Sequence, residues 1–527
     1  MSETSTTISD LSRKKPEASW GVGATISRNI AASLLRVAAI SLVALVLPSY
    51  LAHHLPVETY AAWILILQLG AYVSYLDLGI QTGISKFVAE YHAKRDDATA
   101  GHHASAGFAL MTLAGLLGVS LTFGLAWQVP RLFSTMPANL YHDVRISVML
   151  VGFSLSFALV CSVYSAVFLG LQRYWIPMTI LVVNRACFAA SVVAVVALHG
   201  KIATMGLAVA IVNVVTGSLQ VVAWRKKASH ILISLRSVDY RVLKKMARYC
   251  SLQSIWTLGM LCVTGLDITI VGHYDYVETA YYSIATLPTT FVLLIISSMV
   301  NPLMPASSAM STHRSVVEMG EFLVKITRYA TLLLLLTGLP LIVCGYQILS
   351  LWVGSEYALH TYKYLRILVL ANAIRSLCAP YAAMISATGR QGAATVTAIS
   401  EAVVNLSSSL YLASRYGAIG VALGTVLGSL VSVSLHFLIT MHFTHETMVI
   451  SRLRLFRRGV VQPAVVAIPS IVLLPLWWSP AQTLNPQLTV AWAIGTLICA
   501  WFGVLSEKDR KDLMRFARSV SISAPSA

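Results

Sequence analysis

Charged residues are scarce in this chain. Only 11% of its 527 residues are charged, with 21 acidic against 38 basic side chains, whereas soluble domains are about 25% charged. Hydrophobic residues make up 57% of the sequence. This composition leaves no soluble domain of useful size and predicts an all-α integral membrane protein. The net charge of +17 does not indicate a nucleic-acid partner, because the lysines and arginines cluster between apolar spans.

Paired cysteines and metal-binding motifs are also missing. The sequence has 7 cysteines with no Cys-x-x-Cys pair, and its 14 histidines form no His-Glu-x-x-His or comparable motif. We therefore expect no disulfide, no metal site and no cofactor. Six cysteines lie in apolar stretches and one lies at the edge of such a stretch: Cys161, Cys187, Cys262, Cys344, Cys378 and Cys499, with Cys250 at the edge.

Large outer loops are missing as well. The longest predicted outer loops, Val129–Arg145 and Leu349–Tyr364, have only 17 and 16 residues. A membrane-bound enzyme usually needs a substantial outer loop or an exposed nucleophile with its base. The short loops therefore predict a protein that is not an enzyme.

Apolar spans make up most of the chain. About 20 apolar residues cross a bilayer, and the sequence contains about fourteen such stretches. Of the 38 lysines and arginines, 29 fall on the side that holds both termini and 6 fall on the opposite side, which predicts cytoplasmic termini. The predicted parts are a cytoplasmic tail at 1–28, a six-helix bundle at 29–224, a basic cytoplasmic linker at 225–248, a second six-helix bundle at 249–440, two additional transmembrane helices at 458–506 and a cytoplasmic tail at 507–527.

The two predicted bundles have similar segments in the same order. Val57-Glu58-Thr59 opens the second span and Val277-Glu278-Thr279 opens the eighth. Gly170-Leu171-Gln172-Arg173 precedes the fifth span and Ala387-Thr388-Gly389-Arg390 precedes the eleventh, while Gly206-Leu207-Ala208 matches Gly420-Val421-Ala422. These matches predict a six-span repeat, which is a common basis for alternating access.

The stretch from Tyr60 to Arg95 combines a span predicted at 58–82, a buried ionisable group and a basic amphipathic exit. The ionisable group is Asp77, which is costly near the end of a span unless it faces a cavity or a partner. An N-cap or a structural ion pair is an equally good interpretation of Asp77.

This stretch resembles the second span of the polysaccharide transporters, in the segments Ser74-Tyr75-Leu76-Asp77-Leu78-Gly79-Ile80 and Phe87-Val88-Ala89. These transporters belong to the multidrug/oligosaccharidyl-lipid/polysaccharide flippase superfamily. The resemblance covers about residues 25–440 and also rests on 170–173, 266–272, 351–354, 387–390, Asn405 and 416–420. It implies a V-shaped pair of six-helix bundles around a central cavity. It also implies flipping of undecaprenyl-diphosphate-linked repeat units for O-antigen or exopolysaccharide, from the cytoplasmic to the periplasmic leaflet of a bacterial inner membrane.

Six ionisable side chains other than histidine lie inside the predicted spans, away from the span edges: Arg36, Asp77, Arg185, Asp267, Arg375 and Glu401. Counting about 1.5 Å per residue puts Arg36, Arg185 and Glu401 roughly 10 Å from the cytoplasmic span ends. By the same count, Asp77 lies slightly nearer that face, Arg375 lies near mid-membrane and Asp267 lies towards the outside.

The three arginines are candidates for binding the substrate's diphosphate, because the guanidinium fork binds phosphate oxygens bidentately and stays charged. The alternative for each arginine is a buried carboxylate partner or a side chain that reaches the interface. Asp77, Asp267 and Glu401 are candidates for ion pairs or a coupling proton. The three carboxylates balance the three arginines. This balance departs from the cationic lumen that the resemblance implies, and it favours ion pairs that exchange as the cavity opens from one side of the membrane to the other.

Trp63 and Trp256 are candidates for stacking on sugars, although aromatic residues near span ends are more often interface anchors. His53 and His54 are predicted to be solvent-exposed.

The sequence thus predicts a lipid-linked oligosaccharide flippase, with membrane lipids and a polysaccharide polymerase or other export components as partners. The alternatives are a multidrug or small-solute antiporter on the same fold and a membrane-bound polymerase, ligase or acyltransferase of envelope sugars.

Overall fold

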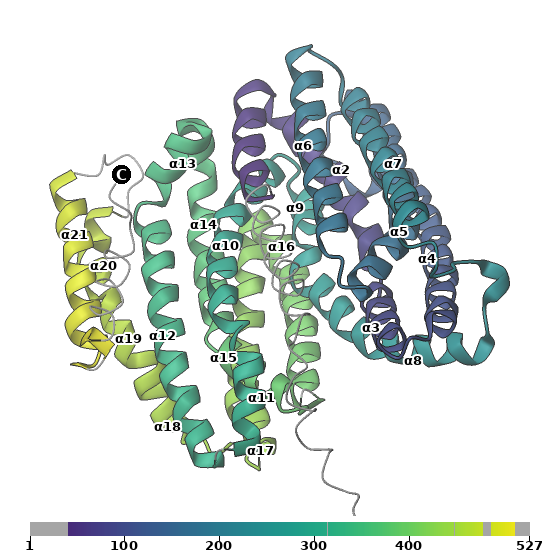
Figure 1. Ribbon diagram of the computed structural model, residues 1–527. Helices are drawn as coiled ribbons and strands as arrows, with labels where there is room; N and C mark the ends of the chain where they lie inside the picture. Colours follow the sequence, from purple (N-terminus) through teal and green to yellow (C-terminus); the bar gives the residue numbers. More distant parts are fainter. Residues whose placement is uncertain are drawn as a thin grey trace, which may run out of the picture.

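The computed structural model describes residues 40–313, 315–390, 392–446, 448–477, 486–507 and 509–511. Every regular element within these ranges is a helix (Figure 1). The apolar side chains therefore pack helix against helix, and a helix satisfies its backbone polar groups within its own segment except at its ends, which suits a bilayer.

The N-terminal half contains one short apolar helix and the helices that follow it. The helices are Ile40–His54, α2 (Val57–Tyr75), α3 (Ile80–Ala93), α4 (Asp97–Leu132), η1 (Ala138–Leu140), α5 (Tyr141–Gly170), α6 (Trp175–Ala197) and α7 (Ile202–Lys227).

The C-terminal half begins after a short connecting segment. Its helices are η2 (Leu235–Ser237), α8 (Tyr240–Met260), η3 (Leu261–Gly265), α9 (Asp267–Tyr274), α10 (Glu278–Val300), α11 (Leu303–His313), α12 (Val316–Val343), α13 (Gly345–Val353), α14 (Ser355–Ser376), α15 (Ala379–Ala387), α16 (Gly392–Leu435), η4 (His436–Thr440) and α17 (Met441–Phe443).

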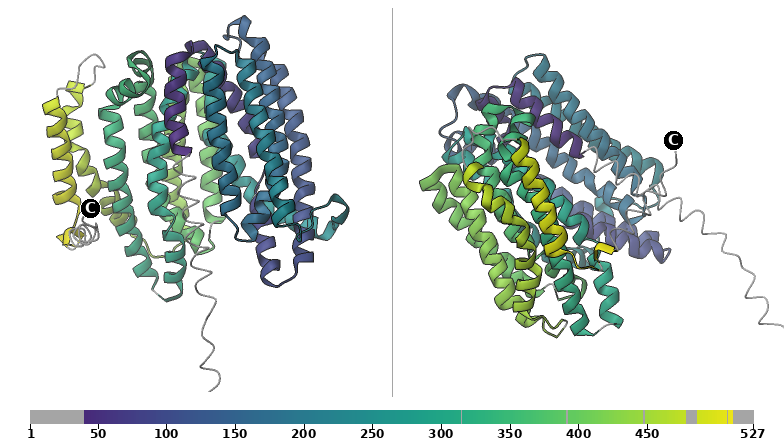
Figure 2. Two further views of the ribbon diagram at one scale, coloured as in Figure 1. Left: turned by 45° about the horizontal axis from the view of Figure 1, so that its top comes forward. Right: turned by 90° about the vertical axis from the view of Figure 1, so that its left-hand side faces the viewer.

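The last helices lie at the outer edge of the C-terminal half, beside α12 (Figure 2). They are α18 (Arg452–Arg454), η5 (Leu455–Val461), α19 (Gln462–Ala464), η6 (Val465–Ala467), α20 (Ile468–Trp477), α21 (Pro486–Cys499) and η7 (Ala500–Val504).

Twelve helices in the described ranges are long and apolar enough to cross a membrane. One of them, Ala394–Phe443, is 50 residues long and contains a non-helical residue, Gly417, with φ 56° and ψ −138°. Gly417 divides this helix into the predicted eleventh and twelfth spans. The helix Ile40–His54 overlaps the predicted first span, whose beginning lies outside the described residues. Because one of the twelve helices holds two predicted spans, the twelve helices correspond to thirteen of the fourteen predicted spans, and the helix Ile40–His54 lies at the remaining one.

Two predicted boundaries differ from the structure. The span predicted at 58–82 is broken, because α2 ends at Tyr75 and α3 begins at Ile80, with positive φ at Leu78 and Gly79 between them. The basic linker is also shorter than 225–248. Helix α7 continues to Lys227, and α8 starts at Tyr240 because the Asp239 side chain accepts a hydrogen bond from the Arg241 amide.

The turns before α6 and α16, which the sequence matches as parts of a repeat, have the same backbone conformation, and so do the turns at Arg95 and His199. Gln172 and Gly389 occupy the same position in the two turns and have positive φ values of 57° and 75°. The amide of the next residue bonds to the carbonyl five residues earlier in both turns, Arg173 to Phe168 at 2.8 Å and Arg390 to Ile385 at 3.0 Å. The two turns therefore have the same conformation despite different sequences.

The buried side chains show how the halves meet. The loops at 94–96, 228–239, 388–390 and 448–451 define the basic end of the molecule, and the loops at 133–140, 198–201 and 354 define the opposite end (Figure 1). The largest buried cluster joins both halves and includes Tyr60 and Trp63 from one and Tyr282 and Tyr364 from the other. Towards the basic end one buried cluster lies in the N-terminal half, with Met246 and Cys250 of α8 packed into it, and another lies within the C-terminal half. The halves are therefore joined at the opposite end and have separate cores at the basic end.

Polar contacts join the halves at the opposite end as well. The Tyr276 hydroxyl donates to the Glu58 carbonyl at 2.6 Å, and the Trp352 indole nitrogen donates to the Leu45 carbonyl at 2.7 Å. A bilayer provides little hydrophobic drive between helices, so such packing and hydrogen bonds hold the halves together.

Candidate substrate and ion-pair site

A buried ion pair links α14 to α16. Arg375 Nε lies 2.6 Å from Glu401 Oε1, and the two side chains are 17% and 10% exposed. Arg375 Nη1 also donates to Asn372 Oδ1 at 3.4 Å, one turn earlier on α14. Among the described residues, Arg375 Nη2 is buried and has no hydrogen-bond partner. The predicted alternative of a carboxylate partner therefore holds for Arg375, with one donor nitrogen still unused.

The contact between Arg375 and Glu401 joins two residues that the sequence placed at different depths. Counting residues placed Arg375 near mid-membrane and Glu401 near the cytoplasmic face, but the two side chains are in contact. The arginine side chain is long, and counting along the sequence ignores the tilt of the helices and the reach of the side chain.

Asp267 is the first residue of α9 and is 7% exposed. Its Oδ2 accepts long hydrogen bonds of 3.5 Å from the hydroxyls of Tyr282 on α10 and Thr425 on α16. Its Oδ1 is buried without a hydrogen-bond partner in the described ranges. Asp267 also interacts electrostatically with Arg375.

These residues form one group with two carboxylates, Asp267 and Glu401, and one guanidinium, Arg375. If all three are ionised, the group carries a net charge of −1. A group of that charge binds a proton or another cation more readily than it binds a diphosphate. The sequence did not single out Tyr282 or Thr425, because tyrosine and threonine are common in transmembrane helices and nothing in their spacing marks them.

Asp77 lies in the turn between α2 and α3. Its Oδ1 accepts a hydrogen bond of 3.0 Å from the amide of Gln81, in the first turn of α3. The carboxylate thus satisfies a free amide in the first turn of α3, although the N-cap residue of this helix is Gly79 and not Asp77.

Arg185 is exposed on α6, and no hydrogen bond or ion pair to it is found among the described residues. Val192 and Val196 lie seven and eleven residues further along, which places them on the same face of the helix. Both valines are buried in the cluster that joins the halves. This face of α6 is therefore buried at Val192 and Val196, towards the end opposite the basic loops, and exposed at Arg185. In Figure 1, α6 lies on the side of its half that is nearest the C-terminal half.

The remaining sequence candidates have different positions. Arg36 lies outside the described residues, and so does the side chain of Trp256. Trp63 is 1% exposed in the shared core and has no surface for a sugar in this conformation. His53 and His54 are exposed, as predicted.

Two cavities follow successive turns of α12. A pocket of about 260 Å³ towards the basic end is lined by Glu321, Val324, Lys325, Arg328, Arg454 and Arg458. An apolar groove of about 1010 Å³ continues along the helix, between α12 on one side and α21 and η7 on the other. Its lining residues include Leu332, Leu336, Ile498 and Phe502. Arg328 is bound to Asp509 at 3.0 Å where the two cavities meet.

Solved structures with the same fold are membrane transporters. A multidrug resistance MATE family transporter of the MOP superfamily, in an inward-facing conformation, matches 79% of this chain and 98% of its own at a TM-score of 0.65 and 15% identity. The lipid II flippase MurJ, in an inward closed conformation, matches 89% of this chain and 98% of its own at a TM-score of 0.69 and 14% identity. A MOP superfamily transporter from Pyrococcus furiosus matches 78% of this chain and 94% of its own at a TM-score of 0.54 and 17% identity.

This chain has the MATE/MurJ-like membrane transporter fold. No protein-family model matches the sequence, and no curated protein matches it. An outward-facing structure of a MATE transporter matches with a lower TM-score, 0.58, than the inward-facing one.

Proposed function

We propose that this protein flips undecaprenyl-diphosphate-linked oligosaccharide repeat units across the bacterial inner membrane by alternating access. The basic end faces the cytoplasm in this proposal, with both termini on that side, as the distribution of lysine and arginine favours. The repeat units supply surface or exported polysaccharide.

The apolar groove beside α12 is the observation that best supports a lipid-linked substrate. Its lining on α21 and η7 runs from Ile494 to Leu505, which corresponds to roughly 16 Å of helix. Such a groove suits a long hydrocarbon chain, and the basic pocket on the preceding turns of α12 suits its phosphate. The flippase structure also matches more of this chain than the MATE transporter does, 89% against 79%.

Within this proposal, Arg185 and Arg375 contribute guanidinium groups to the headgroup path. Arg185 is exposed where the cores of the two halves separate, and Arg375 keeps a donor nitrogen that its partners do not use. Asp267 is the best candidate for a coupling proton, because Glu401 is bound to Arg375 and Asp77 accepts a hydrogen bond from the Gln81 amide.

Deletion of the gene, followed by analysis of lipid-linked intermediates, tests this function. We expect complete repeat units to accumulate on the cytoplasmic leaflet, and we expect the intact gene to restore export. Normal distribution of the intermediates in the deletion strain would reject the proposal.

An antiporter for drugs or small solutes is the second candidate. The buried group with two carboxylates and one arginine favours it, since its net negative charge suits exchange of a proton against a cationic solute. Deletion would then raise drug susceptibility and leave the lipid-linked intermediates unchanged.

A further inference from the structure

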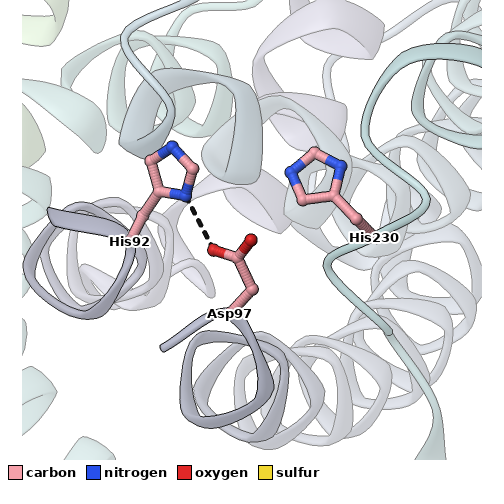
Figure 3. A group of neighbouring side chains, drawn as sticks. All are labelled: His92, Asp97 and His230. Carbon is pink, nitrogen blue, oxygen red and sulfur yellow. Dashed lines mark hydrogen bonds and ion pairs between the residues drawn. The ribbon is translucent and has the colours of Figure 1, made fainter. Parts of the chain in front are cut away.

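Three potential metal ligands come together at the basic end, far from the ion-pair group. His92 lies in the last turn of α3, Asp97 is the first residue of α4, and His230 lies in the segment between α7 and α8. One ligand atom from each residue lies within 4.8 Å of the others. Figure 3 shows the Asp97 carboxylate between the two imidazole rings. His92 Nδ1 donates to Asp97 Oδ1 at 2.7 Å.

The backbone places His92 and Asp97 together through a tight turn. Arg95 has a positive φ of 59°, and the Asp96 amide donates to the Tyr91 carbonyl at 3.0 Å. The Asp96 side chain then caps α4 by accepting from the Thr99 amide at 2.9 Å. The turn reverses the chain and holds both ligands on one side.

The third ligand is held in place by contacts on both sides of it. The Trp224 indole, which precedes His230 on α7, donates a hydrogen bond of 3.2 Å to the carbonyl of Ile231, the residue after His230. Ser105 on α4 donates to the Leu232 carbonyl at 3.3 Å and accepts from the Ser234 amide at 3.1 Å. The segment that carries His230 is therefore docked on α4, the helix that carries Asp97.

We propose that His92, Asp97 and His230 bind a divalent transition-metal ion, with zinc the best-fitting class. Zinc takes imidazole nitrogen and carboxylate oxygen at about 2.0–2.2 Å, and three protein ligands leave the fourth tetrahedral position for water. Two ligands in a tetrahedral zinc site are therefore about 3.4 Å apart, so the side chains must move inward by roughly 1 Å. His92 and His230 are exposed and Asp97 is half-buried, so rotation of the side chains provides that movement.

The donor set argues against magnesium and calcium. Both ions prefer oxygen ligands and high coordination numbers, and two of the three ligands here are nitrogens. Imidazole suits zinc, copper, nickel and iron.

The bound ion would hold the segment between α7 and α8, which connects the two halves, against the N-terminal half. The only chain segment between α7 and α8 carries His230, and α8 continues along the N-terminal half, where Lys245 lies over the rings of Phe87 and Tyr91. A metal bridge from His230 to His92 and Asp97 holds the start of α8 against α3 and α4. The site is independent of the proposed function, since it needs only the fold.

Zinc binding by the purified full-length protein tests the site. Equilibrium dialysis or titration calorimetry should give one zinc ion per chain, and cobalt should give the visible absorption of a four-coordinate site. His92→Ala and His230→Ala are each expected to weaken zinc binding at least tenfold. His102→Ala is the matched control, because His102 is exposed on α4, the helix that carries Asp97, and bonds the Ser237 carbonyl at 3.0 Å without belonging to the group.

A second readout separates binding at this site from binding elsewhere. The segment at 225–248 is rich in lysine and arginine, and zinc should slow its cleavage by trypsin in the native chain and in His102→Ala. The protection should be absent in His230→Ala. Zinc binding that is equal in the native chain and in the His92→Ala/His230→Ala double variant would overturn the proposal, and so would zinc binding without protection of the segment.

Discussion

Removing Arg375 is expected to destabilise the C-terminal half. The side chain is 17% exposed and bound to Glu401 at 2.6 Å, and Asp267 lies within its electrostatic reach. Arg375→Ala leaves both carboxylates without a cation, and breaking a buried ion pair from one side costs about 3–5 kcal/mol. That cost lowers the ratio of folded to unfolded protein by about two to four orders of magnitude.

A second change should restore part of the loss. In Arg375→Ala/Glu401→Ala only one carboxylate remains, so the double variant should be more stable than Arg375→Ala alone. The assay is the temperature at which detergent-solubilised protein loses its monodisperse elution peak. The reasoning fails if Arg375→Ala melts with the native chain, or if the second change destabilises the protein further.

The same variants separate a structural from a transport role for Arg375. Arg375→Lys keeps the charge and loses the planar fork. If Arg375 also meets the substrate's diphosphate, Arg375→Lys should lower polymer export while the amount of folded protein stays normal. Normal export per folded molecule in Arg375→Ala would remove Arg375 from the substrate path.

Three further predictions concern transport and topology. Arg185→Ala should abolish export with unchanged thermal stability, because this exposed side chain has no protein partner among the described residues; a fall in stability that matches the fall in export would contradict this. Asp267→Asn should remove the dependence of transport on a proton gradient and leave folding intact, as measured by uptake into energised vesicles; unchanged gradient dependence would exclude Asp267 as the coupling group. Reporter fusions after Ala527 and within Asp275–Glu278 should report opposite sides of the membrane, and the same side for both would contradict the topology.

The sequence was sufficient for the class of fold and the order of the spans. Span length and apolar composition are local properties, so they can be identified from the sequence without any knowledge of packing. The break at Leu78 and Gly79 was missed, because the apolar character continues through it and only the backbone conformation shows it. The early start of α8 was missed for a related reason, since the basic residues that suggest a loop also lie on its exposed face.

The candidate sites depended on contacts between distant segments. Arg375 and Glu401 were both recognised as buried charges, but their contact joins α14 to α16 and needs the three-dimensional arrangement. The group at His92 and Asp97 shows the same limit more clearly. Its third ligand, His230, comes from another part of the chain, so no motif of fixed spacing marks the site.

The seventh predicted span connects the two halves and contains a change of helix type. Helix α8 packs on α3 and α4 of the N-terminal half, and α9 enters the core that the halves share. Between them, η3 is a π-helix, a feature that often occurs at functional sites. The carbonyl of Gly265, its last residue, accepts a hydrogen bond of 2.6 Å from Gln68 on α2. Asp267 follows two residues later, so the buried charge group lies at the point where the span passes from one half to the other.

Gly265→Ala is therefore expected to impair transport. A methyl group at Gly265 would lie 2.8 Å from the hydroxyl oxygen of Tyr75 and 2.8 Å from a methyl carbon of Leu261, so these side chains must shift. Such overpacking costs about 1–3 kcal/mol and acts here on the contact between the halves. Gly259→Ala is the matched control on the same span, because a methyl group there meets nothing within 4 Å. Export per folded molecule should fall in Gly265→Ala and stay normal in Gly259→Ala, and equal export in the two variants would show that the π-helix contact does not limit the movement of the halves.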